Sequence, residues 1–274
     1  MSTGTPQADV KALEARDISA LVRDGERQRG VVFLHGIGSN AASFVPMLRA
    51  WPQGPMLLAW TAPGYGASRP LAKDWPVADD YALGLASLLD AQELYAVDLV
   101  GHSLGCLIAA AFARRFPQRV RRVALLSPAL GYSVPAETHL PPEIAARIAD
   151  LQTLGAERFA EARAARLVFQ PERKLKVLAA VRDAMRQVTM PGYAQAVRML
   201  ASGDLIADAV ALPHPITIAN GAEDVITPPA GSERLHAACF GSRLVLVPNT
   251  GHALPQEALD EMVHLLSGLF GGAP

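Results

Sequence analysis

The sequence is poor in cysteine, in net charge and in long apolar runs, and each shortage excludes a class of protein. Two cysteines in 274 residues exclude a disulfide-bonded scaffold and a cysteine-based zinc cluster. The 25 basic and 26 acidic residues give a net charge of −1. This balance argues against a nucleic acid or an anionic membrane as the main partner, because both select basic proteins. The longest uncharged run, between Asp98 and Arg114, is shorter than the roughly 20 apolar residues of a membrane-spanning helix.

Two further features are missing. The residues from Met1 to Lys11 are polar and lack the apolar stretch of a signal peptide, so we expect a cytoplasmic protein. The seven histidines are scattered and form no H-E-x-x-H pair. We therefore expect neither a metal site nor a cofactor.

Half of the residues are apolar. They form short continuous runs, and between these runs lie segments whose apolar residues have the spacing of a helix. The apolar runs that predict strands are 31–34, 56–60, 96–100, 120–126, 215–219 and 244–247. The segments that predict helices between them are 77–91, 104–116, 230–238 and 255–270. This alternation predicts an α/β fold, a mostly parallel sheet with helices on both faces.

The alternation of predicted strands and helices stops between residues 132 and 205, where no strand pattern appears. The stretch is rich in proline at first and then predicts helices over 143–154, 158–168, 175–188 and 193–200. The strand pattern resumes after Pro213. We therefore predict a core formed by residues 1–131 and 206–274, with a helical lid (132–205) inserted between two core strands.

The most specific motif is Gly101-His102-Ser103-Leu104-Gly105, which follows one predicted strand and begins a helix. A Gly-x-Ser-x-Gly sequence in that setting is typical of a nucleophile elbow, in which serine occupies a strained turn and glycines avoid clashes with adjacent backbone. A serine hydroxyl is a weak nucleophile and needs a base that a third group orients.

The elbow therefore requires an acid and then a histidine later in the chain, at strand ends. Asp224 follows the predicted strand 215–219, and His252 follows the strand 244–247. Both are expected at the carboxyl edge of the sheet, where catalytic groups of open parallel sheets gather. Glu223 is the competing acid.

Several motifs together resemble the lidded α/β-hydrolases of the serine esterase and lactonase type. They are His35-Gly36, Pro63-Gly64-Tyr65-Gly66-Ala67-Ser68, the elbow, Gly221-x-x-Asp224-x-x-x-Pro228 and Gly251-His252. The region from Gly192 to Pro229 is similar to 3-oxoadipate enol-lactonases. One position departs from the family pattern, because Thr61 stands where this family often has aspartate.

The resemblance implies acyl transfer from a small ester or lactone, in which Ser103 attacks a carbonyl and His252 transfers the proton. It implies that Asp224 orients the imidazole, and its spacing from Gly221 to Pro228 favours Asp224 over Glu223. The backbone N–H groups of Ile37 and Leu104 are expected to form the oxyanion hole, with Gly38 as the alternative to Ile37. The residues expected to line the pocket are Gly36, Gly38, His102, Met190, Tyr193 and Val225.

Other interpretations remain open. A carbon–carbon bond hydrolase of a ring-cleavage product or an amide hydrolase would share the triad, and a hydrolase-like protein that binds a ligand without turnover would share the fold. The run Gly36 to Ala41 fits a dinucleotide fingerprint, but the acid expected about 20 residues later is missing. Cys106 is expected to be a buried apolar residue rather than a nucleophile. The predicted lid carries ten Lys or Arg against eight Asp or Glu, which suggests either a carboxylated substrate or a solvated helix face.

Overall fold

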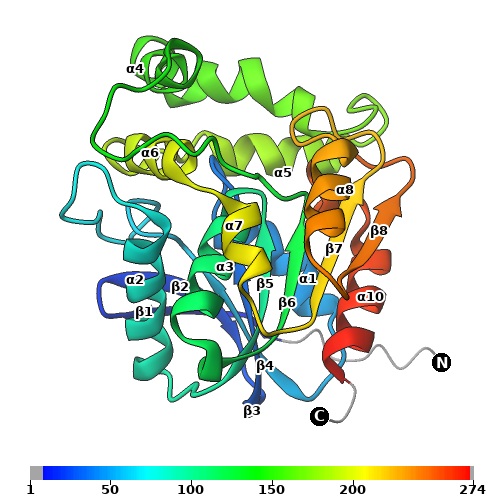
Figure 1. The fold of residues 1–274 in the computed structure, drawn as a ribbon. Helices are drawn as coiled ribbons and strands as arrows, with labels where there is room; N and C mark the ends of the chain where they lie inside the picture. Colours follow the sequence, from blue (N-terminus) through cyan, green and yellow to red (C-terminus); the bar gives the residue numbers. More distant parts are fainter. Residues whose placement is uncertain (1–8, 272–274) are drawn as a thin grey trace.

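The computed structural model describes residues 9–271, and its centre is one eight-stranded sheet (Figure 1). The strand order is β1-β2-β4-β3-β5-β6-β7-β8. The strands are β1 (Lys11–Ala15), β2 (Ile18–Arg23), β3 (Glu26–Leu34), β4 (Pro55–Trp60), β5 (Val97–His102), β6 (Val120–Leu126), β7 (Ile216–Gly221) and β8 (Arg243–Val247). From β4 to β8 every neighbouring pair is parallel, which confirms the predicted sheet.

The antiparallel edge of the sheet was not predicted. Strand β1 pairs antiparallel with β2, and β2 pairs antiparallel with β4. The turn between β1 and β2 consists of Arg16 and Asp17, which both have positive φ angles of 54° and 61°. Positive φ at both central residues is typical of a type I′ hairpin, which usually has Asn-Gly or Asp-Gly at these positions. This hairpin forms without a glycine, so its usual sequence signal is missing.

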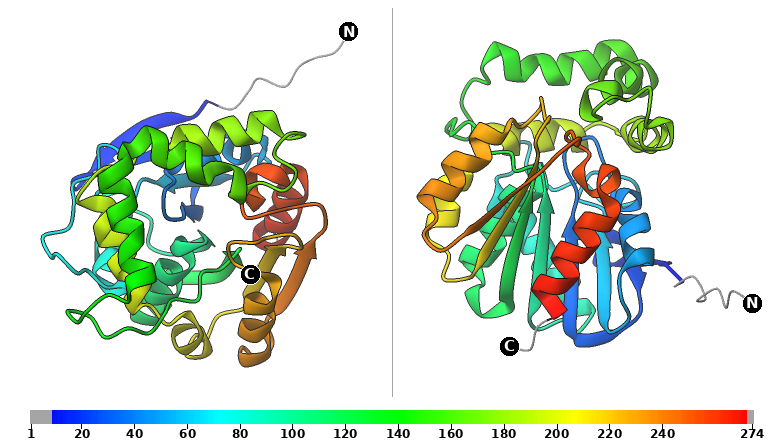
Figure 2. Two further views of the ribbon diagram at one scale, coloured as in Figure 1. Left: turned by 90° about the horizontal axis from the view of Figure 1, so that it is seen from above. Right: turned by 90° about the vertical axis from the view of Figure 1, so that its right-hand side faces the viewer.

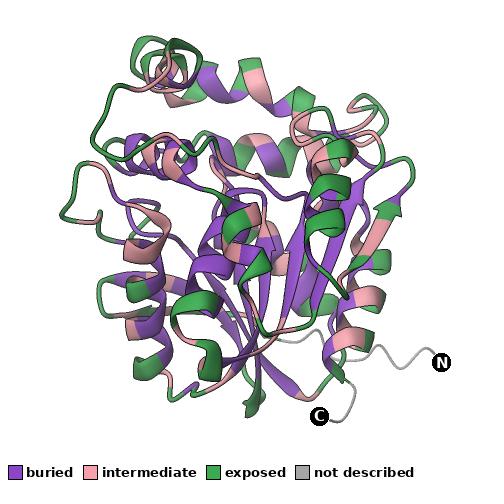
Figure 3. Ribbon diagram, in the orientation of Figure 1, coloured by how far each residue is buried: buried purple, intermediate pink, exposed green. Residues whose placement is uncertain are grey.

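Helices cover both faces of the sheet because alternate strand residues point to opposite sides. Val32 and Leu34 of β3 pack in the core cluster that includes residues of α2 (Ala78–Ala91), α3 (Leu104–Arg115) and α8 (Pro229–Ala238). Val31 and Phe33 pack in the opposite cluster, with α1 (Val45–Ala50), α9 (Leu254–Glu257) and α10 (Leu259–Gly271). The central strands β4, β5 and β7 are accordingly buried along almost their whole length (Figure 3). The helix predicted over 255–270 is in fact two helices, α9 and α10.

Between β6 and β7 the described chain contains helices and no strand. They are α4 (Pro142–Arg163), η3 (Ala164–Leu167), α5 (Leu175–Met185), α6 (Gly192–Ser202) and α7 (Leu205–Val210). We call α4 to α6 the inserted helices, and they lie together at one end of the sheet (Figure 2). The helices predicted over 143–154 and 158–168 correspond to α4, which has a break at Gly155 where φ is 70°, followed by η3. Within residues 9–271, no helix is both long enough and apolar enough to cross a membrane.

Candidate active site

Ser103 occupies the turn between β5 and α3. Its φ and ψ angles are 53° and −115°, a conformation that costs a non-glycine residue roughly 1–3 kcal/mol. The flanking glycines explain how the turn closes. A Cβ atom at Gly101 would lie 2.6 Å from the carbonyl oxygen of Gly105, and one at Gly105 would lie 2.1 Å from that of Leu34. The two glycines thus let the start of α3 pack directly on the ends of β5 and β3.

Asp224 and His252 come from the loops that follow β7 and β8, and their side chains meet. The distance between His252 Nδ1 and Asp224 Oδ2 is 2.8 Å, and both residues are buried. Oδ1 of Asp224 accepts hydrogen bonds from the backbone N–H groups of Ile226 and Thr227, at 2.8 Å and 2.9 Å. Oδ2 also accepts from Thr227 Oγ1 at 2.9 Å. The carboxylate is therefore held on both oxygens.

The electrostatics of Asp224 favour its charged form. Burial raises the pKa of this carboxyl, but the hydrogen bond and charge of His252, together with the N–H groups of Thr227 and Ile226, outweigh burial and lower the pKa below its usual value. Asp224 is thus an anion at neutral pH. Glu223 faces elsewhere, because its Oε2 accepts a hydrogen bond from the backbone N–H of Thr250 at 2.9 Å.

Two other histidines surround the site as neutral groups. His102 donates from Nε2 to the carbonyl oxygen of His252 at 2.8 Å. Burial, with the nearby His252, lowers the pKa of His102 to about 3. His35 donates from Nδ1 to Gly36 and accepts at Nε2 from the N–H of Ala62. Burial lowers the pKa of His35 to about 4, so both imidazoles act as fixed dipoles.

Backbone donors are available next to Ser103. Among residues 9–271, no protein acceptor bonds the backbone N–H of Ile37 or of Leu104. The N–H of Leu104 lies at the first position of α3, where an α-helix leaves its donors unpaired. The N–H of Gly38, by contrast, contacts Tyr65 Oη at 3.4 Å. In the described part of the chain, Ile37 rather than Gly38 therefore has the free N–H on the loop after β3, and Leu104 has another at the start of α3.

A cavity of about 490 Å³ includes Ser103 and His252 in its wall. The core contributes the loops after β3, β6 and β7, and the inserted helices contribute apolar side chains such as Phe159, Met185, Tyr193 and Leu200. Phe159 and Tyr193 pack edge to face, with ring centroids 5.3 Å apart. This volume fits a small organic molecule.

A model of the alpha/beta hydrolase family matches residues 31–265 of the chain. The chain belongs to that family. It is 27% identical over 228 residues to the pimeloyl-[acyl-carrier protein] methyl ester esterase of Neisseria meningitidis, over 81% of this chain and 85% of that one. It is 29% identical over 178 residues to the (E)-2-((N-methylformamido)methylene)succinate hydrolase of Acinetobacter baylyi. The latter match covers 64% of each protein, so it spans just under two thirds of that relative.

Solved structures of this hydrolase family share the fold. The enol-lactonase from Burkholderia xenovorans superposes with a TM-score of 0.84 at 23% identity, covering 96% of this chain and 100% of that one. The predicted fold and the predicted resemblance are therefore confirmed. The prediction of a hydrolase enzyme is confirmed at the level of the family.

The predicted pocket residues of this hydrolase divide into two groups. Gly38, Tyr193 and Val225 line the cavity. Gly36, His102 and Met190 do not. Gly36 packs behind Ser103, because a Cβ there would lie 2.9 Å from the serine Cβ. His102 is turned toward the carbonyl of His252. Met190 precedes α6 and leaves 37% of its surface exposed.

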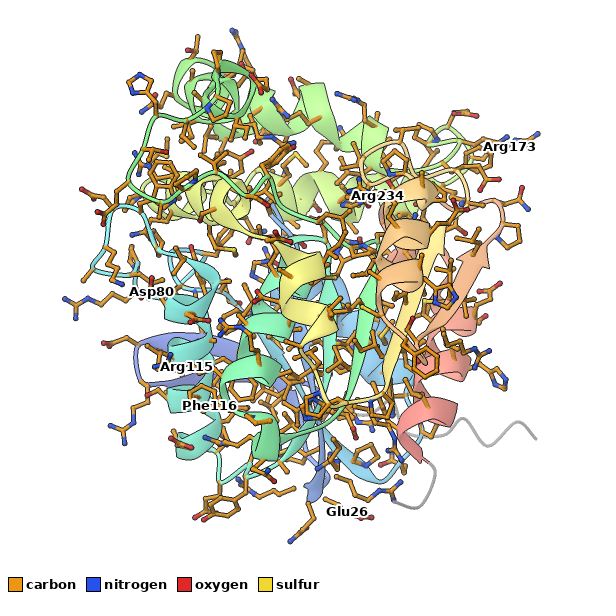
Figure 4. The ribbon with its side chains drawn as sticks, viewed as in Figure 1. Glu26, Asp80, Arg115, Phe116, Arg173 and Arg234 are labelled. Carbon is orange, nitrogen blue, oxygen red and sulfur yellow. The ribbon has the colours of Figure 1, made fainter. Side chains whose placement is uncertain are left out.

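The residues that sequence reasoning missed are four arginines in the cavity wall. They are Arg147 and Arg163 of α4, Arg166 of η3 and Arg234 of α8. Figure 4 labels Arg234 between α8 and the inserted helices. The sequence signal for the three arginines of α4 and η3 was the small basic excess of the inserted segment, and no signal pointed to Arg234 on α8. In the described chain, no group of three or more His, Cys, Asp or Glu could hold a metal ion. Cys106 is buried as predicted, and burial raises the pKa of its thiol.

Proposed function

We propose that the protein is a serine hydrolase that cleaves a small ester or lactone, with Ser103 as nucleophile, His252 as general base and acid, and Asp224 as the group that orients His252. The observation that carries this proposal is the 2.8 Å contact between Asp224 and His252, in a site where His252 and the strained Ser103 share one cavity wall. A nucleophile, its base and the orienting acid are the parts that acyl transfer needs.

In the proposed reaction, Ser103 Oγ attacks the carbonyl carbon while its proton passes to His252 Nε2. The negative charge on the former carbonyl oxygen is stabilised by the N–H groups of Ile37 and Leu104. The imidazolium then protonates the leaving oxygen, the ester bond breaks, and the acyl group remains on Ser103. Water then attacks the acyl carbon and gives its proton to His252, which returns it to Ser103 Oγ as the bond between the acyl group and Ser103 breaks and the carboxylic acid leaves.

The choice of Asp224 over Glu223 is supported by the hydrogen bonds of each acid. An imidazole that accepts the serine proton at Nε2 must carry a proton on Nδ1, and the charged acceptor beside that atom is Asp224. Glu223 instead accepts from the backbone of Thr250. Hydrolysis of a carbon–carbon bond or of an amide would use the same three groups. The choice of an ester or lactone as the bond that is cleaved is therefore supported by the resemblance to esterases and lactonases.

The cavity wall supports a substrate that carries a carboxylate in addition to the scissile bond. Of its described lining residues, four are arginines and none is Asp or Glu. Arg163 is paired with Asp150 and lies over the ring of Phe159, with 4.7 Å between guanidinium carbon and ring centroid. Arginine recognises carboxylates through two parallel hydrogen bonds. We therefore propose an anionic ester or lactone, a class that also includes the enol-lactone suggested by the resemblance.

We also propose that residues 132–205 act as the lid of this site. The support is that Phe159, Met185, Tyr193 and the wall arginines of α4 and η3 all come from this segment. Such a lid would influence which substrate binds, because nine of the 24 described lining residues come from it.

Labelling with a fluorophosphonate probe tests the nucleophile and also the alternative of binding without turnover. We expect the wild type to label and Ser103→Ala not to label. Ser39→Ala is a suitable control, because Ser39 lies on the neighbouring loop and bonds Ser43 rather than the triad. An unlabelled wild type would refute the proposal. A panel of neutral esters, carboxylated esters, enol-lactones, amides and dienoates then identifies the scissile bond.

A further inference from the structure

The side chain of Glu257 is buried beneath the loop that carries His252. None of it is exposed, and both of its carboxylate oxygens accept hydrogen bonds. Oε1 accepts a hydrogen bond from the backbone N–H of Gly251 at 3.0 Å. Oε2 accepts from the backbone N–H of Phe169 at 2.9 Å and from Lys174 Nζ at 2.8 Å. One carboxylate thus joins the His252 loop to the segment between η3 and α5.

Other hydrogen bonds join the same two segments. Lys174 Nζ donates to the carbonyl oxygen of Asn249 at 2.6 Å. The backbone N–H of Ala253 donates to the carbonyl oxygen of Leu167 at 2.9 Å. The packing is equally close, because a Cβ at Gly251 would lie 2.8 Å from the backbone nitrogen of Phe169. Residues 167–174 and 249–257 therefore form one hydrogen-bonded unit.

His252 lies at the middle of this unit. The residue before it, Gly251, is held by Glu257, and the residue after it, Ala253, is held by Leu167. The carbonyl of His252 itself accepts from His102. The backbone that aims the imidazole at Asp224 is thus fixed on both sides by groups outside the triad.

We propose that Glu257 and Lys174 are positioning residues that hold His252 in line with Asp224 and Ser103. This inference rests on the proposed function. Glu257 neutralises Lys174 and satisfies two backbone donors at once, so the pair ties the inserted segment to the histidine loop. Its role is distinct from that of Asp224, which contacts the imidazole directly.

The experiment compares Glu257→Gln and Lys174→Met with Lys11→Met. In Glu257→Gln an NH₂ group replaces one oxygen and faces donors, so one link is lost. The control removes an ion pair of nearly equal length, 2.7 Å to Asp24, at the exposed edge strand β1. Steady-state kinetics with 4-nitrophenyl acetate give kcat and KM. Proton NMR of ¹⁵N-histidine-labelled protein follows the Nδ1–H of His252.

We expect Glu257→Gln to lower kcat roughly 10-fold to 100-fold, because a small misplacement of a catalytic group costs up to about 10²-fold. KM should change little, and the Nδ1–H resonance should shift or broaden. Lys174→Met should show the same pattern with a smaller loss, and Lys11→Met should match the wild type. A purely structural role would lower thermal stability but leave kcat and the resonance of the folded protein unchanged.

Wild-type kcat and an unchanged resonance in folded Glu257→Gln would overturn the inference. If that variant does not fold, Lys174→Met decides, because Lys174 is partly exposed and its loss leaves the backbone links in place. A wild type without labelling or turnover would overturn the proposed function instead. The NMR comparison would then still test whether Glu257 sets the geometry of His252.

Discussion

Replacing Asp224 by asparagine changes the site in a way that the structure defines closely. Oδ1 accepts from two backbone N–H groups, and Oδ2 accepts from His252 and Thr227. The asparagine oxygen should take the place of Oδ1, since an NH₂ group there would face two backbone donors. Each such unsatisfied donor costs about 1–3 kcal/mol. The NH₂ group should therefore take the place of Oδ2 and face His252 Nδ1.

This orientation forces the wrong tautomer of His252. Facing a donor at 2.8 Å, Nδ1 must accept, so the neutral imidazole carries its proton on Nε2. Nε2 then cannot accept the proton of Ser103. In the serine-triad template the same change lowers kcat about 10⁴-fold, which corresponds to about 5 kcal/mol in the activation free energy. We expect a loss of this size here, with the variant still folded.

Steady-state hydrolysis of an ester, together with thermal unfolding, measures both effects. Glu223→Gln is the matched control, because it changes the adjacent acid in the same way but alters a contact with the backbone of Thr250. We expect this control to retain kcat within about tenfold, since the amide oxygen can still accept. A damaging Glu223→Gln beside an active Asp224→Asn would refute the assignment of the acid.

Three further predictions concern the cavity, the pH dependence and the packing. Joint substitution of Arg147 and Arg234 by alanine should raise KM for a carboxylated ester about tenfold or more, since these two side chains line the cavity. KM for a neutral ester should stay nearly unchanged. Equal changes in both KM values would contradict the proposed substrate class. Burial lowers the pKa of His35 to about 4 and that of His102 to about 3 in the folded protein, so the unfolded chain takes up both protons first as pH falls. The contribution of each histidine to stability is therefore complete above about pH 6.5 and decreases by about 3 kcal/mol toward pH 4. Urea unfolding that is independent of pH in this range would contradict the prediction. Gly105→Ala should destabilise the protein by about 3 kcal/mol or prevent folding, because the new Cβ would lie 2.1 Å from a backbone oxygen. Gly268→Ala on α10 should instead stabilise the protein by up to about 1 kcal/mol, because no atom lies within 4 Å of the new Cβ and alanine favours a helix. Thermal or urea unfolding measures both effects.

The parallel strands could be predicted because helices cover both of their faces. Strands of this kind are continuous apolar runs, as in β4, where all six residues are buried. Strand β1 has no such pattern, because its residues Lys11 to Ala15 are mostly exposed and include good helix formers. Its partner β2 alternates between more and less buried residues near its start, and the turn between them lacks glycine. The antiparallel edge of the sheet therefore could not be predicted from the pattern of apolar residues or from a turn motif.

Part of the candidate site could be predicted from the sequence and part could not. Ser103, Asp224 and His252 could be named because each lies on a loop at a strand end, within a short motif whose glycines the backbone requires. Their catalytic roles stay predictions. The cavity arginines could not be named, because they lie on helices whose orientation depends on packing against the core. Met190 is predicted to line the cavity as an apolar residue of the lid, but it precedes α6 and is partly exposed.

The arginines in the cavity wall have a consequence for the end of the reaction as well as for its start. On the proposed function, hydrolysis creates a new carboxylate next to Ser103, so the acid product carries one negative charge more than the substrate. The described wall offers positive charge and no Asp or Glu to repel that product. The side chains that favour substrate binding would therefore also slow the release of the acid product, and more so at low ionic strength, where the charges are less screened.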